Sequence, residues 1–171
     1  MTTDRIRAAI EAATGHYAAH PEQARSIDSE ARASLVDGLV IEVEGPAGER
    51  LTTDMVRSVG GTGSGPSPGW LLRAAEASCV TTLIAMRAAV LGITLETVEV
   101  VVDSESDDRG MLGMDDAVPS GPLTGRVRVR LIADGVDHAT LEELARWGVD
   151  HCPVCNALER LVPITVEVVT N

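Results

Sequence analysis

The sequence predicts an α+β fold over 171 residues, and three observations lead to this class. Apolar and polar residues alternate over residues 39–44, as in a half-buried strand. A long apolar run at residues 68–91 has the length of a central helix. Two more alternating stretches follow at residues 93–103 and 125–134. Strand clusters separated by helices, without regular βαβ alternation, favour α+β over α/β.

The N-terminal stretch, residues 3–20, predicts an amphipathic helix. Ile6, Ile10 and Tyr17 recur at helical spacing, and Pro21 ends the pattern. We therefore expect residues 1–22 to form a helical appendage, available to pack on a partner subunit. Residues 23–171 would form the main domain.

A β-hairpin or meander is predicted within residues 24–56, with turn signals at residues 37–38 and 45–48. The glycine-rich stretch 59–69 then serves as the entrance to a helix rather than as a linker. Ser67 suits the N-cap and Pro68 the first turn. The helix over 68–91 is apolar nearly all round, which predicts central burial.

The remaining elements are two strands, two helices and a closing strand. The strands at 93–103 and 125–134 are joined by a long loop, and Arg126, Arg128 and Arg130 share one face of the second, which predicts a solvated sheet face. Helices are expected at residues 138–149 and 153–161, with a break between them, and a strand at 164–169.

Composition excludes several functions. The chain has 14 basic residues, all arginine, against 26 acidic ones, for a net charge of −12. Without lysine it cannot form a Schiff base or a Walker phosphate loop. Its acidity and few aromatic rings argue against nucleic-acid and anionic-membrane partners. No stretch approaches a membrane span in length, and the N-terminus lacks a signal-peptide core, so we expect a cytoplasmic protein.

Three cysteines are the candidates for chemistry: Cys79, Cys152 and Cys155. Cys79 lies in the long apolar helix, where a structural core cysteine is the ordinary interpretation. Glu76, one turn earlier on the same face, is less ordinary, because a buried carboxylate needs a partner. Cys152 precedes Pro153 at a helix start, where the helix dipole lowers a thiol pKa.

The Cys152-Pro-Val-Cys155 motif has three interpretations. A thioredoxin-like site would normally lie near the beginning of its domain, whereas this motif lies near the C-terminus. A zinc site could use His151, Cys152 and Cys155, but adjacent residues rarely bind one tetrahedral metal. The third interpretation pairs Cys152 with distant Cys79 as a dithiol. Spacing alone leaves these open.

Three segments resemble the OsmC/Ohr superfamily, the osmotically inducible protein C and organic hydroperoxide resistance proteins. GGTGSGPSPGWLLRAAEASCVTTL resembles the loop and helix that carry the first cysteine of this family. DDRGMLGMDD resembles a loop typical of one branch, and HCPVCNALERLVPITVEV resembles the second-cysteine motif and closing strand. The resemblance runs from about residue 25 to the end of the chain.

The resemblance implies an intertwined homodimer, in which a β-sheet wraps around two central helices and the paired thiols lie near the dimer interface. It implies thiol-dependent reduction of organic hydroperoxides in oxidative-stress defence, with Cys79 as the reactive thiol and Cys152 as the resolving thiol. Cys155 inherits no role. The partners would be a small-molecule peroxide and an external thiol or dithiol reductant, and no metal or organic cofactor is implied.

Two positions bear on activity. Active relatives place a glutamate after the proline that begins the long helix, to orient an arginine beside the thiolate, whereas this chain has Gly69 there. The family arginine comes from the first strands, where Arg32 is the candidate activator and Arg25 the alternative. Gly69 therefore favours a second hypothesis: a non-catalytic dimer of this fold that binds a small molecule or senses redox state.

Overall fold

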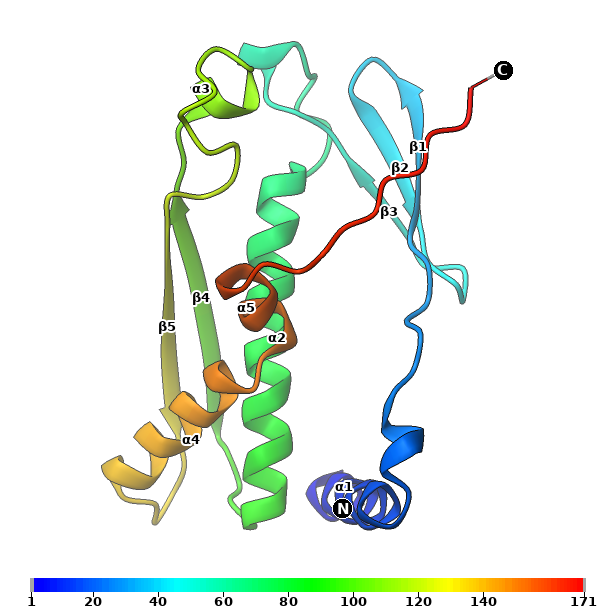
Figure 1. Cartoon of the computed structure of the whole chain (residues 1–171). Helices are drawn as coiled ribbons and strands as arrows, with labels where there is room; N and C mark the ends of the chain where they lie inside the picture. The colour runs from blue at the N-terminus through cyan, green and yellow to red at the C-terminus, as the bar shows by residue number, and fades with distance from the viewer. Residues whose placement is uncertain (1, 171) are drawn as a thin grey trace.

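The computed structural model describes residues 2–170 and confirms the α+β class. Figure 1 shows a long central helix flanked by a two-stranded ribbon and two shorter helices on one side and a small sheet on the other. Two short 3₁₀ turns complete the described elements, which are α1 (Thr2–Ala19), η1 (Pro21–Ala24), β1 (Arg32–Asp37), β2 (Val40–Glu44), β3 (Arg50–Thr53), η2 (Arg57–Val59), α2 (Pro68–Leu91), β4 (Thr97–Glu105), α3 (Asp108–Met111), β5 (Thr124–Ile132), α4 (His138–Asp150) and α5 (Pro153–Glu159).

The predicted meander is confirmed as the antiparallel sheet β1-β2-β3. Arg32 lies opposite Glu44 in the register of the β1–β2 ladder, at one of its ends. This sheet stands apart from α2 in Figure 1. Some of its apolar side chains are uncovered. Leu35 is 68% exposed and Val36 64% exposed. A sheet with uncovered apolar side chains indicates that a further surface packs on it.

The core forms where α2 lies against the β4–β5 ribbon and α4. Val80 and Ile84 of α2 and Leu144 of α4 are fully or almost fully buried. The ribbon contributes alternate apolar residues to this core, among them Val98, Val100, Val127, Val129 and Leu131. Alternation along a strand sends the intervening residues to the opposite face.

That opposite face carries the three arginines of β5, as predicted. Arg126 and Arg128 both pair with Asp103, while Arg130 lies 3.9 Å from Glu99. All three guanidinium groups are exposed, so these are solvated cross-strand ion pairs that contribute little to stability each.

Helix α2 begins and ends where the sequence predicts. The Ser67 hydroxyl accepts a hydrogen bond from the Trp70 amide at 3.2 Å, and Gly92 ends the helix at φ 73°. The expectation of burial on all sides is wrong for the single chain, since Trp70 at its start is 51% exposed. By length and composition alone α2 could also cross a membrane, contrary to the expectation that no stretch approaches a span, although soluble core helices meet the same criterion.

The glycine-rich entrance to α2 is folded around one buried carboxylate. Asp54, 1% exposed, accepts hydrogen bonds from the amide and hydroxyl groups of Thr62 and Ser64 and from the Met55 amide. Gly61 is required here, because a β-carbon would overlap the Met55 carbonyl. Asp54 therefore fixes the path by which the chain enters α2.

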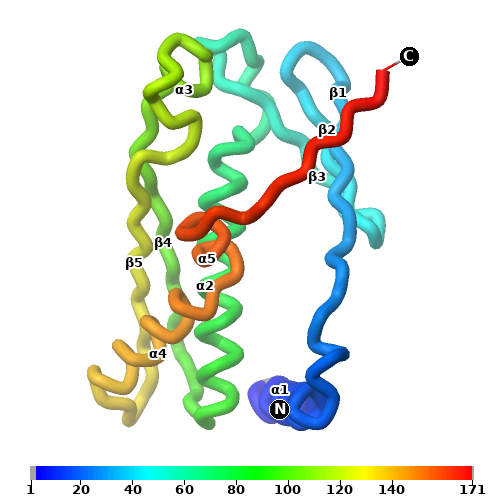
Figure 2. The backbone as a smooth tube through the Cα atoms, in the orientation of Figure 1, coloured from blue at the N-terminus to red at the C-terminus, as the bar shows by residue number. Residues whose placement is uncertain are grey.

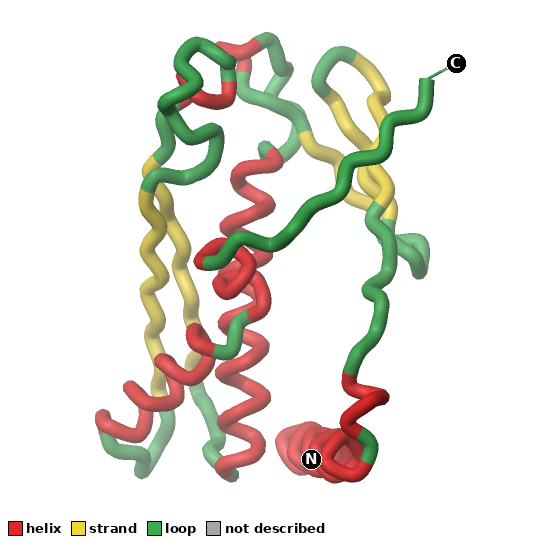
Figure 3. Tube along the Cα trace, in the orientation of Figure 1, coloured by secondary structure: helices red, strands yellow, loops and turns green. Residues whose placement is uncertain are grey.

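Two segments differ from the prediction. The closing strand expected at residues 164–169 does not form within the single chain: these residues, coloured as loop in Figure 3, form no ladder within residues 2–170. Ile164, Val166 and Val168 are each more than three-quarters exposed. A strand needs a hydrogen-bonding neighbour, and this single chain offers none beside the segment. The long loop after β4 also contains the short helix α3, which the sequence did not predict.

Helix α1 packs against α2 within the same chain. Ile10 and Glu11 of α1, Met86 and Arg87 of α2 and Trp147 of α4 line a hollow of about 430 Å³ between the three helices. The tube in Figure 2 follows the chain from α1 up to β1 through a segment without further regular structure beyond η1.

Candidate functional site

The two predicted redox cysteines meet where α2 contacts the junction of α4 and α5. Cys79 lies on α2, packed against the buried cluster that contains Cys152. Gly148 lets α4 approach this closely, since a β-carbon there would overlap the Ile84 side chain. Packing of two helices thus brings together thiols that are 73 residues apart in the sequence.

Cys152 is the N-cap residue of α5. Its sulfur accepts a hydrogen bond from the Cys155 amide at 3.3 Å. Burial raises the pKa of Cys152, but hydrogen bonds from the Cys155 amide and thiol, the Cys79 thiol and the Val154 amide outweigh it and lower the pKa. The helix-start argument is confirmed: Cys152 is the cysteine that most readily carries a negative charge.

For Cys79, the causes that raise the pKa outweigh the one that lowers it. Burial raises its pKa, and so do the hydrogen bond to Cys152 and the charge of that neighbour, while the Val154 amide lowers it. Yet Cys79 is only half-buried, whereas Cys152 is completely buried. Accessibility and acidity are therefore divided between the two thiols, and the one that a small molecule can reach is Cys79.

Cys155 lies in the same buried cluster as Cys152, and the sequence predicted no role for it. It is 5% exposed, and its sulfur donates a hydrogen bond to Glu76 Oε1 at 3.7 Å. Burial, the Cys152 thiol and the Glu76 carboxylate all raise the pKa of Cys155 strongly. Glu76, one turn from Cys79 on an apolar helix, was the signal in the sequence, but it did not reveal which cysteine this carboxylate contacts.

Arg32, the predicted activator, lies on β1 in the separate sheet. It lines a shallow hollow with Glu30, Glu44 and Pro46, and the structure does not bring it to Cys79 within one chain. Among residues 2–170, neither Arg32 nor the alternative Arg25 takes part in an ion pair or side-chain hydrogen bond. Both guanidinium groups are therefore unengaged in the single chain.

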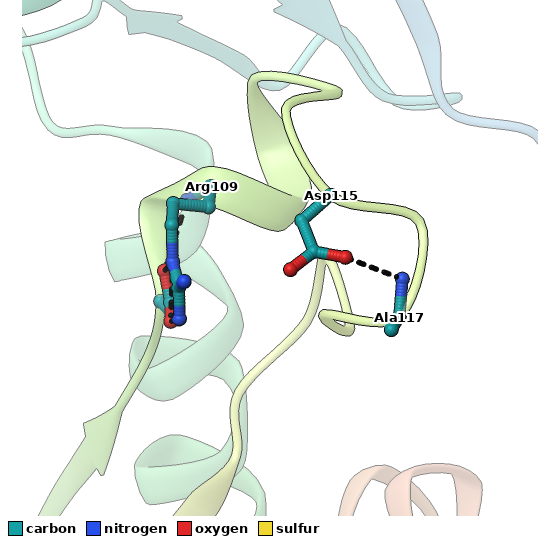
Figure 4. A network of polar contacts seen from close by, with 4 residues as sticks. Arg109, Asp115 and Ala117 are labelled. Atoms are coloured by element: carbon teal, nitrogen blue, oxygen red, sulfur yellow. Dashed lines mark hydrogen bonds and ion pairs between the residues drawn. The ribbon is translucent and has the colours of Figure 1, made fainter.

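Most other arginines already have partners. Figure 4 shows the loop that follows β4, where Arg109 pairs with Asp107 and Asp115 accepts a hydrogen bond from the Ala117 amide at 3.0 Å. Hydrogen bonds from Arg109 lower the pKa of Asp107 to about 2. Arg146 pairs with Glu142 on α4.

The zinc interpretation would require His151 beside the cysteines. Its ring instead stacks on Trp147, with centroids 4.1 Å apart, and its Nδ1 lies 2.9 Å from the Trp147 carbonyl. The Cζ atom of Arg87 lies over the same indole ring, 5.1 Å from its centroid. Within residues 2–170, no three potential metal ligands of the His, Cys, Asp or Glu type come together.

A cavity of about 760 Å³ opens next to the cysteines, between α2, α5 and the start of β5. Its polar lining comes from Arg73, Glu76, Ser104, Thr124, Cys155 and Glu159. Arg73 also donates a hydrogen bond to Ser104 Oγ at 3.2 Å. The rest of the lining is mainly apolar, including Leu72, Leu123, Val127, Val149, Leu158 and Leu161. Cys79 is not part of this lining, so Cys155 is the thiol that faces the cavity.

Gly69 occupies the first turn of α2 in open surroundings. A β-carbon at this position would meet only the Ser67 hydroxyl, 4.0 Å away. No acidic residue lies in the first turn of the helix. A longer side chain would fit there, so steric exclusion does not explain the glycine.

A family model described as OsmC-like protein matches residues 61–167. No curated protein matches this chain. Solved structures do: the chain is 25% identical to an organic hydroperoxide resistance protein OsmC from Legionella pneumophila, covering 78% of this chain and 90% of that one, with a TM-score of 0.58.

Two further structures have the same fold at lower identity. An OsmC-like protein from Mycoplasma pneumoniae is 15% identical, with coverage of 79% and 89% and a TM-score of 0.66. An organic hydroperoxide resistance protein from Elizabethkingia anophelis is 16% identical, with coverage of 78% and 89% and a TM-score of 0.58. The family match spans more than half of the chain and includes Cys79 and Cys152. This chain therefore belongs to the family of OsmC-like proteins.

Proposed function

We propose that this protein reduces organic hydroperoxides through a disulfide cycle between Cys79 and Cys152. The observation that carries the proposal is the division of properties between the two thiols: Cys79 packs against the buried cluster that contains Cys152, and of the two only Cys79 is accessible. A buried, acidic thiol next to an accessible one suits a resolving residue that waits for its partner to be oxidised.

The chemistry follows from these positions. The Cys79 thiolate attacks the outer oxygen of the hydroperoxide, the O–O bond breaks, and the alcohol leaves after protonation. Cys79 then holds a sulfenic acid. Cys152 attacks this sulfur as a thiolate, so that the S–S bond forms as the S–O bond breaks, and the departing hydroxide takes up a proton from solvent to become water. An external thiol or dithiol returns the pair to the reduced state.

Cys79 needs a cation, because burial and Cys152 both raise its pKa. We propose that Arg32, with Arg25 as the alternative, supplies it from a second copy of the chain. Neither arginine takes part in an ion pair or side-chain hydrogen bond within residues 2–170, and the sheet that carries Arg32 has uncovered apolar residues. The homodimer is therefore part of the proposed site. A nearby guanidinium would favour the thiolate and lower the pKa of Cys79.

We also propose that the exposed segment 162–170 pairs as a strand with the second copy. Ile164, Val166 and Val168 alternate with Thr165 and Glu167, as a half-buried strand requires. Their uncovered side chains and the uncovered sheet would bury one another on dimerisation.

The reduced cysteines suit the cytoplasm, where we place the protein.

Gly69 favours a second candidate function, a dimer that binds a small molecule or senses redox state without turnover. The first turn of α2 carries no acid to orient an arginine. Thiol counting separates the two functions. Reduced protein treated with a slight excess of cumene hydroperoxide is expected to lose two thiols per chain early in the reaction, and Cys79→Ser is expected to lose none.

Persistence of all three thiols in the wild type would favour the binding function. A comparison of two peroxides tests the proposed substrate class. The apolar surroundings of Cys79 suit an alkyl hydroperoxide, so cumene hydroperoxide should react faster than hydrogen peroxide. Faster turnover of hydrogen peroxide would contradict the proposed specificity.

A further inference from the structure

We propose that Cys155 is a third redox residue, which takes over the disulfide by attacking Cys152 and so releases Cys79. The inference rests on the proposed hydroperoxide reduction for the formation of the first disulfide. It goes beyond that function because Cys155 has no part in a two-cysteine cycle.

The geometry supplies the attacking group. Cys152 and Cys155 belong to one buried cluster, and Cys79 packs against that cluster, so Cys152 has both other thiols as neighbours. The Cys155 amide donates a hydrogen bond to the Cys152 sulfur at 3.3 Å. When Cys152 is bonded to Cys79, Cys155 remains its neighbour on the same helix. Two cysteines separated by two residues at a helix start form a typical exchangeable dithiol.

Glu76 supplies a proton acceptor. Its Oε1 lies 3.7 Å from the Cys155 sulfur, and the carboxylate helps to keep Cys155 protonated while Cys152 is a thiolate. Once Cys152 enters a disulfide it has no charge, so one cause of the raised pKa of Cys155 disappears. The Cys155 thiol can then lose its proton to the carboxylate as it attacks.

The step balances without an added reductant. The Cys155 sulfur forms a bond to the Cys152 sulfur, and the Cys79–Cys152 bond breaks with its electron pair moving to Cys79. The proton passes from Cys155 to Glu76 and then to the Cys79 thiolate. One disulfide and one thiol are present before and after the exchange.

The transfer has two consequences. Cys79, the accessible thiol, becomes free to reduce a second hydroperoxide before any reductant arrives. The disulfide moves to Cys155, which lines the cavity of about 760 Å³, whereas Cys79 does not. After the transfer, the oxidised pair includes a residue that lines this cavity.

Tryptic peptides distinguish the two disulfides. Cleavage at arginine gives peptide 74–87 with Cys79 and peptide 147–160 with both Cys152 and Cys155. A Cys79–Cys152 disulfide joins the two peptides, while a Cys152–Cys155 disulfide lies within peptide 147–160 and lowers its mass by two hydrogens. Reduced full-length protein is titrated with cumene hydroperoxide without reductant, in the presence of dimedone to trap sulfenic acid, and free thiols are then alkylated.

The wild type is expected to consume about twice as much hydroperoxide per chain as Cys155→Ser. It should show the disulfide within peptide 147–160 together with a dimedone adduct on peptide 74–87. Cys155→Ser should show only the cross-linked peptides. Asn156→Ser, at the exposed neighbouring position, is the matched control and should behave as the wild type.

Glu76→Gln tests the proton acceptor. The conversion of the cross-link into the internal disulfide should slow by about a hundredfold at neutral pH, and its rate should rise about tenfold per pH unit as hydroxide replaces the carboxylate. Glu76→Asp should restore part of the rate at neutral pH. A purely structural role of Glu76 would not change this pH profile.

Hydroperoxide consumption with the cross-link as the only disulfide in the wild type would overturn the relay and leave the two-cysteine cycle in place. No consumption at all would contradict the proposed function, and oxidation with diamide then decides the relay alone. With diamide, the internal disulfide should form in the wild type and not in Cys79→Ser, because Cys152 is buried. Its formation in Cys79→Ser would show direct oxidation of the motif and overturn the relay.

Discussion

Gly148 of α4 lies directly against Ile84 of α2, at a distance that leaves no room for a β-carbon on residue 148. Both residues are buried, and Cys152 follows Gly148 by one helical turn. This contact fixes how closely the end of α4 approaches α2, and with it the separation of Cys152 from Cys79.

Gly148→Ala should therefore destabilise the fold by about 1–3 kcal/mol, because the added methyl group forces Ile84 or the helix backbone to move. Denaturant unfolding measures the change. Gly15→Ala on α1 is the matched control, since a β-carbon there meets nothing within 4 Å and should stabilise the helix by roughly 0.5–1 kcal/mol. Equal effects of the two substitutions would contradict the close contact.

Cys152→Ser should make Cys79 more reactive toward iodoacetamide. The negative charge of Cys152 is one cause of the raised pKa of Cys79, and serine removes it. A lower pKa gives more thiolate at pH 7–8, so we expect the alkylation rate of Cys79 to rise by roughly three- to tenfold. Peptide mass spectrometry of timed samples measures this rate. A slower reaction would mean that Cys152 supports the Cys79 thiolate.

Gly69→Glu should increase both stability and the rate of hydroperoxide reduction. The side chain has room, and a carboxylate in the first turn of α2 interacts favourably with the helix dipole, by about 0.3–1 kcal/mol. In the proposed dimer it would also orient Arg32 toward Cys79. Gly69→Gln, which has similar size without the charge, is the control. Equal rates for the two variants would argue against this role of the charge.

Asp54 should make stability fall at acid pH. Hydrogen bonds from Thr62, Ser64 and the Met55 amide outweigh burial and hold its pKa well below the ordinary value of 3.8. Its ionisation therefore stabilises the folded chain above the unfolded pKa, and this stabilisation is lost as the pH falls through the folded pKa.

Asp54→Asn should lower Tm at pH 7 by roughly 5–10 °C and reduce the dependence of Tm on pH between about 5 and 3. Calorimetry across this pH range measures both effects. Asp115→Asn, which removes a charge from an exposed loop, provides the comparison. A parallel pH dependence in wild type and Asp54→Asn would exclude Asp54 as its source.

The double substitution Val166→Lys and Val168→Lys should shift the protein from dimer to monomer. Both side chains are 78% exposed in the single chain, so charge there costs little until a second copy covers them. Light scattering after size-exclusion chromatography measures the mass. Thr165→Lys, on the alternate face, is the matched control, and an unchanged dimer in the double variant would contradict pairing through this segment.

Local structure could be predicted from the sequence alone. Ser67, Pro68 and Gly92 are sufficient to define the ends of α2, and the alternation of valines and arginines defines the two faces of β5, because caps and periodicity act over a few residues. The position of Cys152 at a helix start likewise predicted the lowered pKa of its thiol, which hydrogen bonds from neighbouring amides and thiols produce. The segment 164–169 forms no strand in the single chain, because alternation indicates a tendency to pair but cannot supply the adjacent strand that pairing requires.

Tertiary structure decided which distant groups meet. No spacing rule places Glu76 beside Cys155, or makes Cys79 the accessible thiol and Cys152 the buried one, since both depend on how α4 and α5 pack on α2 through Gly148. Arg32 could be named from the sequence but not placed at the thiols, because its sheet does not contact them within one chain. Contacts between distant residues arise from the packing of whole elements, and local sequence patterns do not predict them.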